Sequence, residues 1–582
     1  MSSSRVVPKR RQRVIYLNIL LVFDIVLVSC GPVARAATAE PEPQKSPITI
    51  TVISNEPGKK IKTAIARILG TTDVATLEEN KIMLPHCSTG NYISIWAPEH
   101  LIETRPCVDN QDTYELTLTL MPMQDNVDYA WMSAQTCAGC HSDSQGRTEY
   151  LEWTQDKHSR VFLDSYFWTI YSGTDINGNV GAITGRTISE NGQFSRVPNN
   201  SEYGPGFRLD YPNENGNCAY CHAPAAVKRM DQRLTLNAGN SNIPGGHGNA
   251  ETEGITCDVC HKVADVLIEN NRLPFAERPG SLSFLFLRPG TNQLFNLGPL
   301  PDMKLENSNV KASCAPIFSE SKFCAACHYG KFFDTVIYNS YGEWLNSSYS
   351  NPATGNFRSC QDCHMHSAQD VGDTALEQRA ACSASNQNFR NFNHNMMERD
   401  NTGDPALVKG AATLSLTARI ENGQINVAVQ VENTRAGHKF PTDSPLRHLI
   451  LLVEANDQNE MPLAQVAGPT IPLWGGVGTI ADEDYAGRPG EIYANILKDR
   501  DTNQMPTIAF WNPTVPAWDG SDTRLEPNKP VQSEYSFAVP SNGEATITAK
   551  LIYRYAFIEI IRQKKWIPND IIVSEAVPVQ VP

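Results

Sequence analysis

The sequence lacks three features that mark common classes of protein. It contains no Walker loop, and its isolated Ser, Asp and His residues form no recognisable hydrolase constellation. Beyond the N-terminal segment, no hydrophobic run is long enough to span a membrane. Lys and Arg are scattered there instead of clustered, and the formal net charge is -14. Nucleic acid is therefore not expected as a partner.

The N-terminal segment has the layout of a secretory signal, in which basic residues precede an apolar run and small residues follow it. Two cleavage alternatives are open. Leu27-Val28-Ser29-Cys30 is typical of a lipobox that leaves a lipidated Cys30, whereas Ala34-Arg35-Ala36 is typical of ordinary signal cleavage. A retained anchor is disfavoured because the run is short and contains Asp24. We predict a signal peptide over 1–36 and an exported protein, periplasmic or on the outer cell surface, with possible membrane attachment through Cys30.

Cysteine carries the strongest pattern, because ten of the fifteen cysteines fall into five C-x-x-C-H motifs. The motifs are Cys137-Ala-Gly-Cys140-His141, Cys218-Ala-Tyr-Cys221-His222, Cys257-Asp-Val-Cys260-His261, Cys324-Ala-Ala-Cys327-His328 and Cys360-Gln-Asp-Cys363-His364. This is the signature of c-type haem attachment, in which two thiols bond the haem vinyl groups and the adjacent His binds the iron. Zinc knuckles are the alternative. Zinc does not require a His after each pair, so we predict five covalently attached haem c groups.

Four further cysteines lie outside the motifs and the predicted signal. Cys87 and Cys107 are expected to pair within the N-terminal region, because an exported protein occupies a disulfide-permissive compartment. Cys314 and Cys382 leave two alternatives open, a disulfide or two unpaired buried thiols.

Histidines outside the motifs are candidates for the opposite, distal side of each iron. The candidates are histidines that lie few residues from a motif along the chain, that follow the last motif, or that lie at the edge of a strand-rich region. The predicted distal ligands are His158, His247, His394, His438 and, as the fifth, His366. Met365, or no protein ligand, is the alternative for the fifth iron. An iron left open would be a place for substrate chemistry.

Apolar residues alternate with polar ones in the N-terminal region 46–125. The alternating segments are Ile48 to Val52, Tyr92 to Trp96 and Tyr114 to Leu120, and turn residues separate them. The pattern predicts a small β-sandwich. The stretch from Asn91 to Glu99 resembles a strand of transthyretin-like modules.

The same alternation returns in the C-terminal region 406–582, where we predict a second β-sandwich that supplies His438. Asn422-Gly423 and Asn542-Gly543 predict hairpin turns. The predicted strands are Ala411 to Ile420, Ile425 to Val431, Leu449 to Val453, Tyr535 to Val539, Ala545 to Leu551 and Ile571 to Val579.

Between these regions, residues 126–405 contain the motifs together with many Gly, Asn and Pro residues. We predict a central loop-rich α-helical pentahaem cytochrome domain, in which aromatic side chains pack against the haems. The second and third motifs, and the fourth and fifth, lie close in sequence. This spacing predicts that those haems form neighbouring pairs.

Residues around the motifs resemble those of multihaem cytochromes related to the tetrahaem and octahaem hydroxylamine oxidoreductase group. The similar stretches are CAGCH followed by Tyr150, Trp153 and His158; Glu253-Gly-Ile-Thr-CDVCH-Lys-Val; Phe323-CAACH with Tyr341-Gly-Glu-Trp344-Leu-Asn-Ser347; CQDCH-Met365; and Gly437-His438-Lys-Phe-Pro441-Thr442 with Arg447, which resembles an appended β-domain. The resemblance implies distal ligation by the equivalents of His158, His247 and His438. All five motifs end in His, whereas pentahaem nitrite reductases carry a Lys at the catalytic iron. Hydroxylamine oxidoreductases have a catalytic haem that is crosslinked to a tyrosine, and no such tyrosine is identified in this sequence. The resemblance therefore does not assign either enzyme activity to this chain.

Three functions remain open. The leading hypothesis is electron transfer between redox-partner proteins along bis-His haems. A second is a reductase or oxidase of small nitrogen or sulfur oxyanions at one open iron. A third is a filament-forming extracellular cytochrome, in which a residue such as His86 ligates a neighbouring subunit's haem. We expect an electron carrier more than a catalyst, and the sequence does not determine the oligomeric state.

Overall fold

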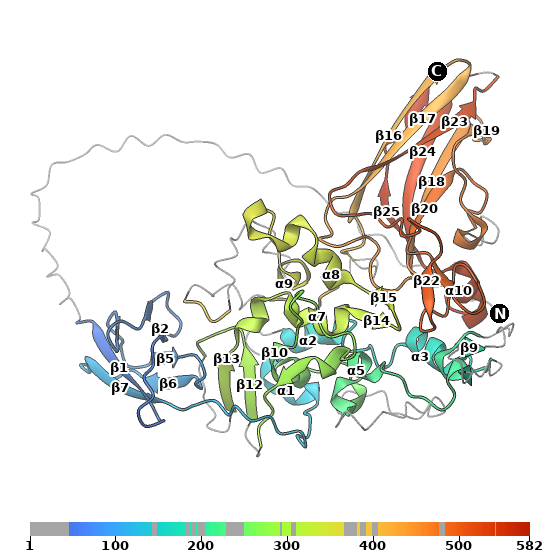
Figure 1. Cartoon of the computed structure of the whole chain (residues 1–582). Coiled ribbons are helices and arrows are strands. Elements are labelled where there is room, and N and C mark those ends of the chain that lie inside the picture. The colour runs from blue at the N-terminus through green and yellow to red at the C-terminus, as the bar shows by residue number, and fades with distance from the viewer. Residues whose placement is uncertain are drawn as a thin grey trace, which may run out of the picture. The chain divides into compact units, whose positions relative to one another are not determined.

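The computed structural model describes residues 46–142, 148–181, 187–188, 194–195, 204–227, 250–290, 294–303, 310–365, 381–384, 392–397, 406–476, 484–541 and 543–582. The chain from Pro47 to Pro582 belongs to one unit (Figure 1). The predicted signal peptide with Cys30, and the predicted ligands His247 and His366, lie outside the described residues. Among the helices of the described ranges, none has the length and apolar character needed to cross a bilayer.

The N-terminal strands form two sheets that share one core. The first has the order β4-β1-β7 and the second β3-β2-β5-β6. Alternate residues such as Ile48, Ile50, Ile93 and Leu116 are buried between them, as the period-two pattern predicts. The strands are β1 (Ile48–Ser54), β2 (Ile65–Ile68), β3 (Val74–Thr76), β4 (Lys81–Leu84), β5 (Tyr92–Trp96), β6 (Glu103–Pro106) and β7 (Thr113–Leu118).

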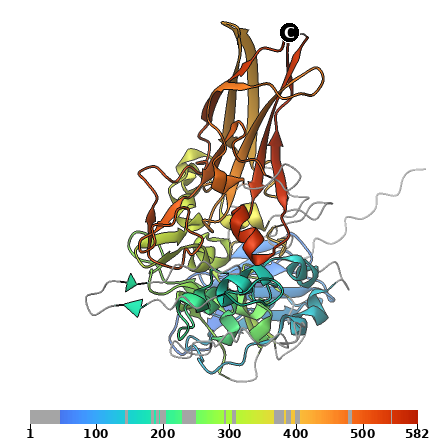
Figure 2. The ribbon, with the colours of Figure 1, turned by 90° about the vertical axis from the view of Figure 1, so that its right-hand side faces the viewer.

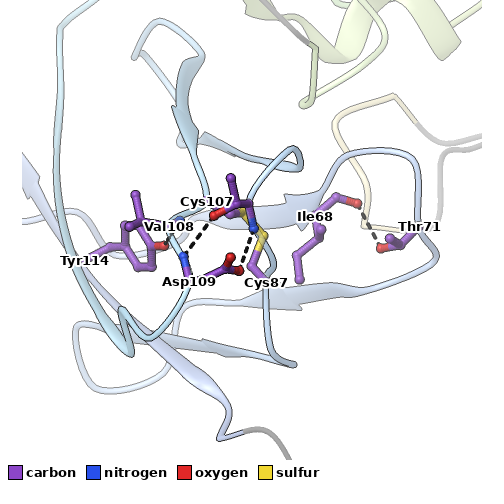
Figure 3. Close-up of a disulfide and its surroundings, with 8 residues drawn as sticks. Ile68, Thr71, Cys87, Cys107, Val108, Asp109 and Tyr114 are labelled. Atoms are coloured by element: carbon purple, nitrogen blue, oxygen red, sulfur yellow. Dashed lines mark hydrogen bonds between the residues drawn. A yellow bond between two sulfur atoms is a disulfide. The ribbon is translucent and has the colours of Figure 1, made fainter.

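Two disulfides lie outside the motifs. Cys87 pairs with Cys107 beside the N-terminal core, which confirms the predicted pair (Figure 3). Next to it the Val108 N–H donates to the Tyr114 hydroxyl. Cys314 pairs with Cys382, which settles the second alternative in favour of a disulfide.

Helices between the two β regions are short, and each motif lies on one. Two Cys side chains three residues apart face the same side of a helical turn, and the motif His follows at or just past its end. The helices are α1 (Ala134–His141), α2 (Glu149–Gln155), α3 (Ser165–Ser172), α4 (Phe207–Asp210), α5 (Ala219–His222), α6 (Cys257–Cys260), α7 (Lys322–His328), α8 (Ser340–Leu345) and α9 (Cys360–His364).

The predicted central α-helical domain is wrong. The described chain has 10 helices that account for 19% helical content, against 32% strand. A motif needs only a turn of helix to bring two thiols to one side, and the chain between motifs then pairs its backbone groups in small sheets. These are formed by β8 (Thr187–Ile188) with β9 (Phe194–Ser195), β10 (Val263–Val266) with β11 (Phe284–Phe286), β12 (Leu294–Gly298) with β13 (Val310–Cys314), and β14 (Gly330–Phe332) with β15 (Thr335–Tyr338).

The C-terminal strands form two larger sheets around a common core (Figure 2). One has the order β16-β17-β23-β19, and the other has β20-β18-β24-β25 with β26 also on β24. Asn422 and Gly423 both have positive φ in the turn between β16 and β17, as an Asn-Gly hairpin requires. The elements are β16 (Ala412–Glu421), β17 (Gln424–Asn433), β18 (His448–Asp457), β19 (Gln465–Ala467), β20 (Gly490–Ala494), β21 (Leu497–Asp499), β22 (Thr514–Pro516), β23 (Val531–Ala538), β24 (Ala545–Arg554), α10 (Ile558–Lys564), β25 (Asp570–Glu575) and β26 (Val579–Val581).

Both β regions are joined to the residues between them by buried polar contacts. On the N-terminal side, the Arg67 guanidinium lies 3.0 Å from the Asp302 carboxylate, and both side chains are buried. On the C-terminal side, Arg524 lies 2.8 Å from Glu343 of α8, again with both side chains buried. The predicted domain boundaries at 125 and 405 stay predictions, because the chain packs across them.

Candidate functional site

One cavity of about 2590 Å³ gathers side chains from all five motifs. It is far larger than the roughly 300–1,000 Å³ of a pocket for one small ligand. Nine of the ten motif cysteines line it, and the exposed Cys140 is the exception. The motif histidines and three predicted distal ligands also line it, namely His141, His222, His261, His328, His364, His158, His394 and His438. The structure therefore brings the described predicted site residues, except Cys140, together around a shared space.

Local capping fixes the motif helices at the cavity wall. The Thr256 hydroxyl accepts a hydrogen bond from the Val259 N–H at the start of α6. At the start of α9, Ser359 and Asp362 form a reciprocal capping box, which satisfies two N–H groups at the helix start. The helical turns that hold the thiols are thus set by their own flanking residues.

Two pairs of histidines face each other across the cavity. The ring centres of His158 and His328 are 6.3 Å apart, and those of His364 and His438 are 6.4 Å apart. Two imidazoles that bind one metal from opposite sides, each with a nitrogen about 2 Å from it, have ring centres roughly 6 Å apart. Each pair therefore has room for one iron. We call the His158–His328 pair the fourth site and the His364–His438 pair the fifth site, after their motifs.

A single hydrogen-bonding pattern orients these histidines. In all five motifs, and in His158 and His438, the Nδ1 atom contacts an oxygen that can only accept. Nδ1 must then carry the proton, and Nε2 keeps its lone pair for a metal. By contrast, His100 in the N-terminal region uses Nδ1 with the Pro98 carbonyl and Nε2 with the Ser54 hydroxyl. It is a satisfied core histidine and not a ligand.

The acceptors differ from site to site. His222, His261 and His364 donate to the main-chain oxygens of Val161 (3.3 Å), Leu297 (2.6 Å) and Met396 (3.3 Å) respectively, and His438 donates to that of Lys439 (2.9 Å). His141 contacts the half-exposed Glu149 carboxylate at 3.3 Å. At the fourth site both acceptors are carboxylates, with His158 bound to Asp156 at 2.7 Å and His328 bound to Asp443 at 3.1 Å.

Burial keeps most of the motif histidines neutral, as metal binding requires. It lowers the pKa of His261 to about 4. The pKa of His364 is lowered to about 4 by burial and by the charge of His438, and burial also lowers the pKa of His222. His328 is different, because the hydrogen bond and charge of Asp443 outweigh burial and raise its pKa.

Asp156 and Asp443 were not predicted from the sequence. Burial favours their neutral forms, but hydrogen bonds from His158 and His328 outweigh it and hold the pKa of each below its ordinary value. Asp156 also accepts from the Met396 N–H at 2.8 Å, and Asp443 from the Ser340 N–H at 3.1 Å. The only sequence signal was proximity, since Asp156 lies two residues before His158.

Thiols of different motifs touch one another, which shows which sites are neighbours. Cys137 hydrogen-bonds Cys257, Cys221 hydrogen-bonds Cys327, and Cys324 hydrogen-bonds Cys360. The first motif thus adjoins the third, and the fourth adjoins both the second and the fifth. The predicted neighbours among the fourth and fifth motifs are found, whereas the second motif's thiol contacts the fourth instead of the third.

Buried polar contacts also hold the loop that carries His438. The Glu343 carboxylate accepts from the Thr442 hydroxyl at 2.7 Å and from the Lys439 N–H at 3.2 Å, and it pairs with Arg524. The Asn433 amide donates to the His438 carbonyl at 2.8 Å. The C-terminal sheets therefore fix His438 against the fifth motif through contacts on both sides of it.

The remaining predicted distal ligands are less defined. His394 lies 3.8 Å from the Glu152 carboxylate, and its charge contributes to lowering the pKa of His261. It is thus placed near the third motif and beside α2, which follows the first motif in sequence. His247 and His366 lie outside the described residues, and His448 is a fully buried residue of β18 that does not line the cavity.

The donor set fits haem c better than zinc. Within the described ranges, no three Cys, His, Asp or Glu side chains gather as a metal cage would require. Burial raises the pKa of Cys218 and of Cys260 to about 12, so these thiols are protonated in the protein without a metal. Paired thiols, opposed imidazoles and a large shared cavity instead fit a flat macrocycle bonded at its edge and ligated from both faces.

No protein-family model matches the chain, and no curated protein matches it. Among solved structures, the chain is similar to a penta-heme cytochrome c552 from Thermochromatium tepidum, with 18% sequence identity and a TM-score of 0.49 over 77% of this chain and 99% of that one. The Fcho1 Mu homology domain of Danio rerio with bound Eps15 peptide is matched at 7% identity and a TM-score of 0.12, over 31% of this chain and 51% of that one. The resemblance to the hydroxylamine oxidoreductase group stays a prediction.

Proposed function

We propose that the protein is an exported pentahaem c-type cytochrome that transfers electrons between redox-partner proteins. The observation that carries the proposal is the shared orientation of seven ligand histidines, each with Nδ1 on an acceptor and Nε2 left for a metal. This arrangement is built from main-chain and carboxylate oxygens that belong to the protein itself. It supports histidine as the residue that would hold the iron at each motif.

When bound, haem c supplies an iron that cycles between Fe(II) and Fe(III). The motif cysteines would hold it covalently, and the motif histidines would ligate it on the proximal side. His158 and His438 would close the fourth and fifth sites on the distal side, so these two positions favour electron transfer over substrate binding. Touching thiols such as Cys324 and Cys360 keep neighbouring sites close.

Haem content tests the proposal directly. Intact-mass measurement and the pyridine haemochrome assay of protein purified from an oxidising compartment should give five covalent haems per chain. Replacing both cysteines of one motif, for example Cys324→Ser with Cys327→Ser, should remove one haem. The matched control, Cys87→Ser with Cys107→Ser, should keep all five. Purified protein with zinc and no covalent haem would overturn the assignment.

Ligation is tested separately by EPR and magnetic circular dichroism. The fourth and fifth sites should be low-spin in the oxidised protein and should not bind added cyanide or nitrite. Protein-film voltammetry should show reversible one-electron waves without a catalytic current. A catalytic current with nitrite or hydroxylamine would instead favour the reductase alternative.

A further inference from the structure

The fourth and fifth sites lie side by side and use the same kind of axial residue, yet their hydrogen-bond acceptors differ. At the fifth site, His364 and His438 donate to the main-chain carbonyls of Met396 and Lys439. At the fourth site, His158 and His328 donate to Asp156 and Asp443. The side chain of Asp156 is fully buried, and that of Asp443 is 14% exposed.

Both carboxylates are held in place by more than the histidine. Oδ2 of Asp156 accepts from the Met396 N–H at 2.8 Å, while its Oδ1 binds His158. Oδ1 of Asp443 accepts from the Asn339 and Ser340 N–H groups at 3.3 and 3.1 Å, while its Oδ2 binds His328. Each aspartate is therefore fixed with one oxygen toward a ligand histidine.

A carboxylate that accepts the Nδ1 proton makes the imidazole a stronger electron donor than a carbonyl does, because it draws the proton away and adds a negative charge. A negative charge a few ångströms from a metal favours the more positive oxidation state. Both effects stabilise Fe(III) over Fe(II). At the fourth site they act from both faces.

We propose that Asp156 and Asp443 lower the reduction potential of the fourth site. This inference rests on the proposed function, since it requires haem at both sites. The fourth motif also contacts the second and the fifth through its thiols, so the site with the lowered potential lies at a junction.

The first motif offers an internal comparison. His141 also contacts a carboxylate, Glu149, but at 3.3 Å, on one face only and with the carboxylate 32% exposed. Solvent screens an exposed charge, so its influence on the iron is expected to be smaller. The three carboxylates thus form a graded series within one protein.

The test is a potentiometric titration followed by EPR. The axial ring planes are at 71° in the fourth site and 13° in the fifth, which is expected to give the two sites distinguishable low-spin ferric signals. Ring orientation itself influences potential, so the comparison is between variant and parent at the same site. Asp443→Asn and Asp156→Asn should each raise the midpoint potential of the fourth site by at least about 59 mV. For a one-electron couple, this shift is a tenfold increase in the ratio of reduced to oxidised haem at a fixed potential.

Controls separate this effect from general loss of charge. Asp175→Asn changes a buried carboxylate that binds Asn179 and Lys565 and no ligand histidine, so it should leave every midpoint unchanged. Glu149→Gln should shift only the first site, and by less than tenfold. Asp443 has a positive φ that Asn tolerates, and Asp156→Asn probes the opposite face independently should Asp443→Asn fail to fold.

The number of covalent haems per chain shows whether a negative result contradicts this inference or the proposed function. Five haems with an unshifted fourth-site midpoint in both aspartate variants would overturn this inference and leave the proposed function intact. An equal shift at the fifth site would also overturn it, because the effect would then not pass through His158 and His328. Parent protein without covalent haem would instead overturn the proposed function.

Discussion

The two β regions contribute different kinds of residue to the cavity. The N-terminal sheets line it with a few residues, among them Arg67, whose guanidinium is committed to Asp302. The C-terminal sheets supply His438, which faces the fifth motif, and Asp443, which binds the fourth motif's histidine. Similar folding patterns in one chain thus serve as a support in one case and as part of the site in the other.

The strongest way to break this comparison is to remove the C-terminal ligand. His438→Ala should leave five thioether-bound haems and convert the fifth site to a high-spin iron that binds cyanide or carbon monoxide, because it removes the imidazole that lies opposite His364. EPR of the oxidised protein and carbon monoxide binding to the reduced protein would show the change.

The matched N-terminal variant is His100→Ala, which changes a buried histidine that faces no motif. It should leave the haem spectra unaltered and lower only the stability. A fifth site that stays low-spin in His438→Ala, or one that changes in His100→Ala, would contradict the roles given to the two regions.

A smaller effect comes from breaking one buried ion pair in each region. Arg524→Ala and Arg67→Ala each remove the cation from a buried carboxylate and should lower the free energy of unfolding by about 3–5 kcal/mol. Denaturant unfolding followed by fluorescence would measure both.

The two arginine variants should differ in their spectra. Arg524 pairs with Glu343, which holds Thr442 and Lys439 beside His438, so its loss should make the fifth site accessible to carbon monoxide. Arg67→Ala should not. Equal spectral change in both would show that the N-terminal region also positions ligands.

The smallest expected effect concerns the disulfide of the N-terminal region. Cys87 and Cys107 are 20 residues apart, and closing a loop of about that length stabilises a protein by about 3 kcal/mol. Cys87→Ser with Cys107→Ser should therefore lower the melting temperature while all haem midpoints stay in place. A shifted midpoint in voltammetry would reveal a coupling that the contacts do not provide.

Local pattern predicted much of the two β regions. The alternation of apolar and polar residues predicted strands close to β1, β5, β16, β17 and β24, because every second side chain of a half-buried strand is apolar and buried. The motif cysteines and histidines were also local, since attachment and proximal ligation need only five consecutive residues.

Non-local contacts were beyond this reasoning. His328 and Asp443 are 115 residues apart, and neither segment contains a sequence pattern that predicts contact with the other. The helix content was overestimated because the motifs suggested helices, whereas each motif occupies only one or two turns and the chain between them forms small sheets. The contact of Cys221 with Cys327 likewise depends on tertiary packing and not on spacing.

The position of His438 and Asp443 in the chain has a consequence for maturation. Both follow the last motif in sequence, so every haem could be attached before the residues that complete the fourth and fifth sites have folded. If the proposed function holds, a chain that ended after the last motif would attach its haems but lack His438, and the iron of the fifth site would stay open on one side. Folding of the C-terminal sheets, which places His438, would then be the step that closes this iron to other ligands.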